Sequence, residues 1–251
     1  MAKPTARVLG LPGRAVRAVP PPSRRSLAIG IGLIVLACGA YAVARETSAF
    51  AVRHIEVAGG SPQLRAHVRK ELASLRGTNL LALNGSALER RVAELPSVVS
   101  ATYDRAFPHT LRISIVPETP VAVLHRGTQT WLVSARARVI ARLVPGTHPL
   151  LTRIWVPTAA PVTVGGFLDP AYGGTAARTL GLVQHFPARI GTATLVHDEL
   201  TFALRSGVEL RFGAPTDIRL KLAIARRALR VLPSGSTYLD VSVPGRPVAG
   251  R

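Results

Sequence analysis

The apolar run Leu27–Ala44 constrains this chain more than any other feature. It holds eighteen residues without a formal charge and is bounded by Arg25 and Arg45. As an α-helix that rises about 1.5 Å per residue it would be roughly 27 Å long, close to the apolar thickness of a bilayer. The sequence therefore predicts one transmembrane helix, over residues 26–45.

The residues before this run are basic and contain no acid, the basic ones being Lys3, Arg7, Arg14, Arg17, Arg24 and Arg25. Short segments rich in Lys and Arg stay on the cytoplasmic side of a membrane. We therefore expect a cytoplasmic N-terminus and about 206 residues outside (251 minus 45). The proline-rich composition of residues 1–25 predicts a disordered basic tail that contacts inner-membrane lipid.

Two other interpretations of the apolar run stay open. A cleaved signal peptide also has a basic start and an A-x-A site, and Ala42-Val43-Ala44 fits that site. Signal-peptide apolar runs usually span about 7–15 residues, however, and this run is longer. A buried core helix is the third interpretation, although the run is apolar on all sides and follows a Pro/Arg-rich tail.

The overall charge is strongly basic, with 32 Lys and Arg against 13 Asp and Glu, a formal net charge of +19. Such a balance suggests nucleic-acid binding first. The chain has no zinc-ligand spacing, no dense basic helix and no aromatic interleaving of the kind that single-strand binders use. We therefore predict no nucleic-acid partner and attribute the charge to a general Arg bias and attraction to anionic lipid.

Residues 50–120 follow the order strand, helix, helix, strand, strand. Ser61 before Pro62 predicts the start of the first helix, and Ser86 with Glu89 three residues later predicts a capping box for the second. The predicted strands lie at Phe50–Val57, Val98–Ala106 and Leu111–Ile115.

Residues 121–248 are richer in strand patterns. We predict a hairpin at 121–133, a strand at 139–143, a helix at 167–186 and a hairpin at 200–212. A helix capped by Thr216 follows, and its apolar face is Ile218, Leu222, Ala225, Leu229 and Leu232. Tyr238–Val243 is predicted as the last strand. The fold class is α+β: one N-terminal transmembrane helix, a β-α-α-β-β module, and a β-rich mixed domain with a C-terminal helix and final strand.

Several local motifs resemble one bacterial family. The opening strand matches "V-x-x-I-x-V-x-G", and later segments match "G-x-N-L", "R-x-x-P-x-T-L-x-I" and a closing "Y-h-D-h-S/R"; the residues are Val52–Gly59, Gly77–Leu80, Arg105–Ile113 and Tyr238–Ser242. Pro117-Glu118 and Pro120-Val121-Ala122 match the junction between two domains. In this order, over residues 27–248, the chain resembles the FtsQ/DivIB family of cell-division proteins, with a POTRA-like domain at 50–120 and an FtsQ-type β domain at 121–248.

Three positions depart from the family pattern. Thr119 replaces a basic residue, Ser134 stands where an acid is common, and Ala137 stands where glycine is common. The region 145–167 matches only loosely. These departures question local turn geometry rather than the resemblance.

The resemblance implies a non-enzymatic scaffold at the division septum of the cell membrane. Its expected partners are FtsB-like and FtsL-like bitopic proteins and, through them, the septal peptidoglycan synthase. In the family these partners dock at the C-terminal end of the second domain, and an exposed sheet edge can accept an extended segment as an extra strand. The predicted partner-binding residues are Tyr238, Leu239, Asp240, Val241, Ser242, Val243, Arg226, Arg227 and Arg230. Val98–Ala106 is a second candidate edge.

No residue pattern indicates catalysis. The seven histidines show no metal-ligand spacing, and Cys38 is the only cysteine, so no disulfide within the chain and no cysteine-based metal site is expected. Nucleophile-elbow and phosphate-loop motifs are absent. We predict no enzyme, no cofactor, no metal and no small-molecule substrate. The alternatives are a POTRA-bearing component of a protein-export or outer-membrane assembly system, and a secreted enzyme with a cleaved leader.

Overall fold

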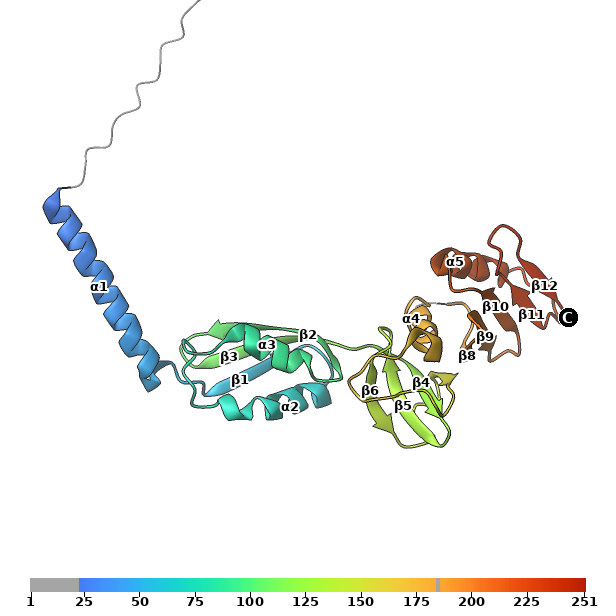
Figure 1. Cartoon of the computed structure of the whole chain (residues 1–251), viewed down its shortest axis with the longest axis horizontal. Helices are drawn as coiled ribbons and strands as arrows, with labels where there is room; N and C mark the ends of the chain where they lie inside the picture. The colour runs from blue at the N-terminus through green and yellow to red at the C-terminus, as the bar shows by residue number, and fades with distance from the viewer. Residues whose placement is uncertain (1–22, 184–185) are drawn as a thin grey trace, which may run out of the picture. The chain divides into compact units, whose positions relative to one another are not determined.

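The structure is a computed structural model that describes residues 23–183 and 186–251 (Figure 1). The predicted disordered tail therefore falls, up to residue 22, outside the described residues. The chain divides between Thr47 and Ser48 into two units, which we describe separately.

The first unit contains the helix α1, Arg24–Glu46, which exceeds the predicted span by two residues at its start and one at its end. Ser23 caps its N-terminus by accepting a hydrogen bond from the Ser26 amide. None of its side chains is buried by protein, and it is long and apolar enough to cross a membrane. Lipid is the environment in which such an all-round apolar surface is stable.

The second unit begins with a three-stranded sheet covered by two helices. Its elements are β1 (His54–Ala58), α2 (Pro62–Glu71), α3 (Gly85–Ala93), β2 (Val98–Ala106) and β3 (Thr110–Pro117). The strand order is β1-β3-β2, in which β1 runs parallel and β2 antiparallel to β3. This confirms the predicted succession of strand, helix, helix, strand, strand.

The helix starts of this module are only partly as predicted. Ser61 caps α2, with Pro62 in the first turn, as the sequence indicates. The start of α3 differs from the prediction, because Asn84 rather than Ser86 is its cap. Glu89 makes no capping box: its Oε1 instead accepts a hydrogen bond from the Tyr103 amide of β2, at 3.1 Å. The module has a core of its own, built from Val52, Ile55, Val57, Val68, Leu72, Leu80, Leu88, Val92, Val98, Leu111, Ile113 and Ile115.

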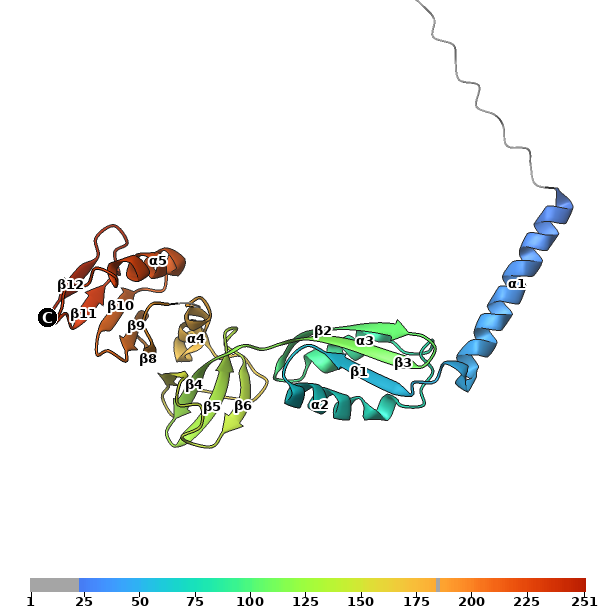
Figure 2. The ribbon, with the colours of Figure 1, turned by 180° about the vertical axis from the view of Figure 1, so that it is seen from behind.

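The rest of the unit is organised around one nine-stranded sheet (Figure 2). Its order is β12-β11-β10-β9-β8-β7-β4-β5-β6. The strands are β4 (Pro120–Arg126), β5 (Gln129–Ser134), β6 (Val139–Leu143), β7 (Thr152–Trp155), β8 (Ile190–Val196), β9 (Glu199–Leu204), β10 (Glu209–Gly213), β11 (Tyr238–Asp240) and β12 (Val248–Gly250).

Two predictions for the middle of this sheet are wrong. The helix expected over 167–186 is only α4, Gly174–Gly181, after a 3-10 turn at Pro170–Tyr172. Gly173, with φ at 88°, has a left-handed backbone that separates the two. The strands β7 and β8 were missed: β7 has only four residues, and its sequence T-R-I-W does not alternate polar with apolar residues although its burial alternates, while β8 lacks a regular alternation in burial as well.

The helix α5, Ile218–Ala228, packs on the C-terminal part of the sheet. Its N-cap is Asp217, which has a positive φ and makes no side-chain cap, so the prediction of Thr216 is wrong. Leu222 and Ala225 are buried as predicted. Beneath the helix, the rings of Phe202 and Phe212 meet edge to face at 5.0 Å in the core of the sheet.

Candidate docking site

The predicted last strand is neither as long as expected nor at the edge of the sheet. Only Tyr238–Asp240 forms β11, which pairs in parallel with β10 and antiparallel with β12. The chain turns back after Val243, where the Arg246 amide donates to the Val243 carbonyl. The edge on this side is therefore β12, three residues long, with Val248 and Ala249 exposed.

The six predicted strand residues divide between the core and the surface. Leu239 and Val241 are 2% and 0% exposed, and both belong to the core. The Val241 amide also donates to the Arg211 carbonyl at 2.8 Å, which prolongs the pairing with β10. Tyr238, Asp240 and Ser242 are half-buried, and Val243 is exposed. A partner can touch only this second group.

The face of the sheet opposite the core carries a polar groove that the sequence analysis missed. It has a volume of about 450 Å³ and is lined by Glu199, Thr201, Glu209, Arg211, Gly213, Asp240 and Ser242. Arg211 donates to the Glu209 carboxylate at 2.8 Å, and this hydrogen bond raises the pKa of Arg211. The lining holds three carboxylates and one guanidinium, so its formal charge is negative. The alternation of polar and apolar residues along β9 and β10 was the available signal.

An aromatic ring joins this groove to the edge strand. The Arg211 guanidinium lies over the Tyr238 ring, 4.6 Å from its centre. Gly250 of β12 pairs directly with Tyr238, and a Cβ atom added to Gly250 would lie 2.5 Å from the Tyr238 hydroxyl oxygen. The ring therefore occupies the space above the glycine.

The three predicted arginines of the C-terminal helix are not equivalent. Arg226 donates to the Leu182 carbonyl at 3.1 Å and lies over the Phe186 ring, so it holds α5 against the segment after α4. Arg227 and Arg230 are exposed, and Arg230 lies beyond the end of α5. Of the three, Arg227 and Arg230 are presented to solvent for a partner.

The second candidate edge, β2, does lie at one side of the three-stranded sheet. It pairs with β3 alone over nine residues, Val98–Ala106. Its side chains at Ser100, Thr102 and Asp104 are exposed. The structure thus places both predicted binding segments at or beside sheet edges.

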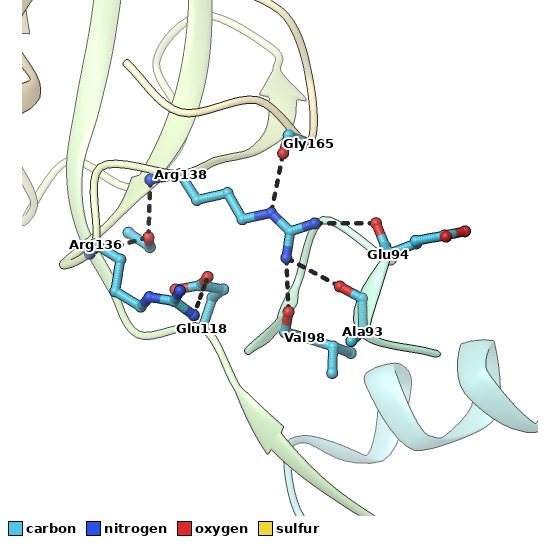
Figure 3. A network of polar contacts seen from close by, with 8 residues as sticks. Ala93, Glu94, Val98, Glu118, Arg136, Arg138 and Gly165 are labelled. Carbon is cyan, nitrogen blue, oxygen red and sulfur yellow. Dashed lines mark hydrogen bonds and ion pairs between the residues drawn. The ribbon is translucent and has the colours of Figure 1, made fainter. Parts of the chain in front are cut away.

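At the other edge of the nine-stranded sheet, the strand β6 is preceded by Arg138, a residue that the sequence analysis did not single out. Figure 3 shows its guanidinium among backbone carbonyls. Its Nη1 donates to Val98 O at 2.7 Å and to Ala93 O at 3.3 Å, and its Nη2 donates to Glu94 O at 3.0 Å. Its Nε donates to Gly165 O at 3.0 Å. A cation at the C-terminal carbonyls of α3 is favoured by the helix dipole.

A charged pair, Arg136 and Glu118, lies beside Arg138 at the junction of the two domains (Figure 3). The Glu118 side chain is 1% exposed and lies 3.6 Å from Arg136 Nη1. The Ser134 hydroxyl accepts hydrogen bonds from the amides of Arg136 and Arg138. The Ser134 hydroxyl thus satisfies two amides of this turn, as an acidic side chain at the same position could.

No group of three or more His, Cys, Asp or Glu that could hold a metal occurs in residues 23–183 and 186–251. Among the histidines in the described part of the chain, only His125 has a shifted pKa, and its ring stacks on that of Trp155 with ring centres 4.4 Å apart. Burial lowers the pKa of His125, and the neighbouring Arg153 lowers it further. His197 and Asp198 form the turn between β8 and β9, with both residues at positive φ.

Comparison with known proteins adds to this geometry. The sequence profile of the POTRA domain, FtsQ-type, matches residues 50–116, which covers β1 to β3. Proteins named cell division protein FtsQ align over nearly the whole chain: that of Streptomyces venezuelae is 24% identical over 95% of this chain and 88% of its own length. The chain carries an FtsQ-type POTRA domain and resembles FtsQ proteins over most of its length. The Streptomyces coelicolor relative is 23% identical over 95% of this chain and 92% of its own.

This similarity supports two conclusions. The FtsQ protein of Mycobacterium leprae is 31% identical over 80% of this chain and 56% of its own length. Because these relatives are cell-division proteins, this chain is a POTRA-bearing protein related to division, which gives no support to the export alternative. The apolar helix α1 and the family together indicate a single-pass membrane protein.

Proposed function

We propose that this protein is a membrane-anchored scaffold of the division septum that holds FtsB-like and FtsL-like partners and, through them, the septal peptidoglycan synthase. The helix α1 anchors the chain, with its N-terminus in the cytoplasm and the two sheet-bearing modules outside. The chain does this by binding alone, without catalysis. The similarity to FtsQ proteins supports the division role, and the basic tail supports the orientation.

The observation that carries the docking proposal is the position of β12 in the strand order. It pairs with β11 on one side only, so its other side can accept an extended partner segment as a tenth strand. The open face next to it supplies the negative groove around Asp240 and Glu209. Arg227 and Arg230 would add salt-sensitive attraction to acidic groups of the partner. The partner-binding surface is thus β11–β12 with Tyr238, Asp240, Ser242, Val243 and these two arginines.

A photo-crosslinking amino acid at Val248 tests where the partner lies. In cells that contain the complete division machinery, we expect cross-links from position 248 to an FtsB-like protein. The control position is Ser234, which is exposed in the loop before β11. Equal cross-linking from both positions, or from neither in a protein that complements division, would exclude docking at β12.

The affinity test compares two substitutions at the same exposed position. Val248→Asp adds a charge next to the negative groove and should weaken capture of the FtsB-like and FtsL-like partners about tenfold, whereas Val248→Thr, which keeps β-branching, should bind like the parent. Val241 is unsuitable for this purpose because it is fully buried, so that Asp or Pro there would disturb the core as well. Equal capture by both Val248 variants would contradict strand addition.

The role in the cell is tested by depletion. Loss of the protein should give filaments without septa, whereas normal division with a defect in export would overturn the scaffold proposal. A reporter enzyme that works only outside the cytoplasm should be active when fused to the carboxyl terminus, and a reporter that works only inside should be inactive there.

A further inference from the structure

One end of the POTRA domain is built from three chain segments that hydrogen bonds hold together. The Gly77 amide donates to Val52 O, and the Arg53 amide donates to His109 O, both at 2.9 Å. The Leu80 amide donates to Phe50 O at 2.8 Å. We call residues 50–53, 76–80 and 107–110 the proximal end, because Phe50 is the first of them to follow the membrane-spanning helix in the chain.

The proximal end exposes an aromatic pair. Phe107, at the turn between β2 and β3, is 54% exposed. Its ring meets that of Phe50 edge to face, with ring centres 5.6 Å apart. A single exposed apolar side chain is common on soluble proteins, so this pair gains meaning only from its surroundings.

The charges around this pair are all of one sign. Arg53 and Arg76 are exposed, and residues 50–53, 76–80 and 107–110 contain no Asp or Glu. The nearest acids on the strands are already engaged: Arg112 lies 3.2 Å from Glu56 and 3.9 Å from Asp104. The proximal end therefore presents phenyl rings and unopposed positive charge together.

The chain itself limits how far this end can be from the bilayer. Phe50 follows Glu46, the last residue of α1, by four residues, and four extended residues span at most about 14 Å. This limit comes from the number of residues alone and requires no particular placement of the two units. The polar layer on each side of a bilayer is itself about 5–7 Å thick. Phe107, which touches Phe50, is thus within reach of the membrane surface.

We propose that the proximal end is a lipid-contact surface: the rings of Phe107 and Phe50 enter the interfacial layer, and Arg53 and Arg76 contact anionic phospholipid headgroups. Aromatic rings favour this layer, and arginines next to it are attracted to anionic lipid. The proposal requires that α1 spans the membrane, and it is independent of partner docking and of which side faces out. It gives the POTRA domain a second attachment to the bilayer.

Fluorescence quenching in lipid nanodiscs tests the insertion. The full-length chain with Cys38→Ala receives one new cysteine, either Phe107→Cys or the control Gln63→Cys, and carries an environment-sensitive dye there. Gln63 is exposed and lies in the first turn of α2, after the other end of β1. With lipids that carry a quencher just below the headgroups, we expect quenching at position 107 to be at least three times that at 63, with blue-shifted emission. Equal quenching at the two positions, in discs that contain the inserted protein, would overturn the proposal.

The lipid specificity has its own comparison. Quenching at position 107 should fall at least twofold when phosphatidylglycerol is replaced by phosphatidylcholine, and also when Arg53→Gln and Arg76→Gln are combined. The matched control combines Arg69→Gln and Arg90→Gln, two exposed arginines on α2 and α3, and should leave quenching unchanged. Equal loss with both pairs, or no dependence on phosphatidylglycerol, would refute headgroup contact. Because no partner is present in the discs, failure here would leave the docking proposal untouched, and the reverse also holds.

Discussion

The two edge strands of the nine-stranded sheet, β6 and β12, differ in what covers them. At β6, Arg138 and the segment around Gly165 cover the start of the strand, and Val139 exchanges backbone hydrogen bonds with Gly165 and Gly166. At β12, three residues end the sheet, with small or β-branched side chains and no covering element among the described residues. An uncovered edge invites pairing with another chain. The comparison teaches that one edge is fixed to the POTRA domain through Arg138, whereas the other edge is short and uncovered, as the docking proposal requires.

The largest expected effect is a loss of stability when Arg138, at the covered edge strand β6, is replaced. Arg138→Met removes every donor to the carbonyls of Ala93, Glu94, Val98 and Gly165, and should lower the free energy of unfolding by about 3–5 kcal/mol. Denaturant titration of the detergent-solubilised chain measures it. The control Arg142→Met changes an exposed arginine of the same sheet edge and should stay within about 0.5 kcal/mol. Equal effects would mean that Arg138 does not secure the junction.

The next effect concerns Lys221, a buried cation in the C-terminal half of the sheet, which we call the open half because it ends at the uncovered strand β12. Lys221 is 3% exposed, and its Nζ donates to Phe212 O at 2.9 Å and Ala214 O at 2.8 Å. Lys221→Met keeps the length of the side chain but leaves two carbonyls without these donors, so it should cost about 1–3 kcal/mol in the same titration. Arg219→Met, on the exposed side of α5, is the control. If both were neutral, the open half would depend on apolar packing alone.

A smaller, local effect is expected at the open edge. Gly250→Ala places a methyl group against Tyr238 and should push the ring away from Arg211, which frays β12. Amide hydrogen exchange at residues 248–250 should accelerate about tenfold while the core strands β8 and β9 stay protected. Gly245→Ala has no neighbouring atom within 4 Å and should change nothing. Faster exchange throughout the sheet would instead show that β12 and the core open together.

The smallest expected effect is a gain in unfolding free energy from a substitution at Ala137, next to the covered edge strand β6. Ala137 has φ at 65°, a left-handed conformation that costs an L-residue about 1–2 kcal/mol. Ala137→Gly removes this strain but also a buried methyl group, so the net gain in unfolding free energy should be at most about 1 kcal/mol. Ala135→Gly, a neighbour with ordinary φ, should destabilise. A loss at position 137 would show that the methyl contact outweighs the strain.

Local patterns predicted much of this fold, and contacts between distant segments account for the rest. The membrane helix, the capping of α2 by Ser61 and the hairpins follow from periodicity and turn residues close in sequence. The departure at Ala137 already indicated an unusual turn. Arg138 was out of reach, because its carbonyl partners lie about 27 to 45 positions away and carry no side-chain signal.

The residues of the candidate docking site remain a prediction. The sequence analysis listed Leu239 and Val241 among the partner-binding residues, but both lie in the core, and the pattern of Tyr238–Val243 could not show that three more residues pair outside them. Those three residues, Val248–Gly250, follow two prolines and a glycine and are too few to show a strand pattern. Arg226 resembled its neighbours in the sequence, and only the position of Leu182 distinguishes it.

The pairing of the end strands also has a mechanical consequence. The strand β12 is held by three residue pairs, whereas β8 and β9 share six. A lateral force applied through a partner bound at β12 would therefore separate β12 from β11 before it loaded the inner strands. Val248–Gly250 would therefore separate under a pulling force before the inner strands do.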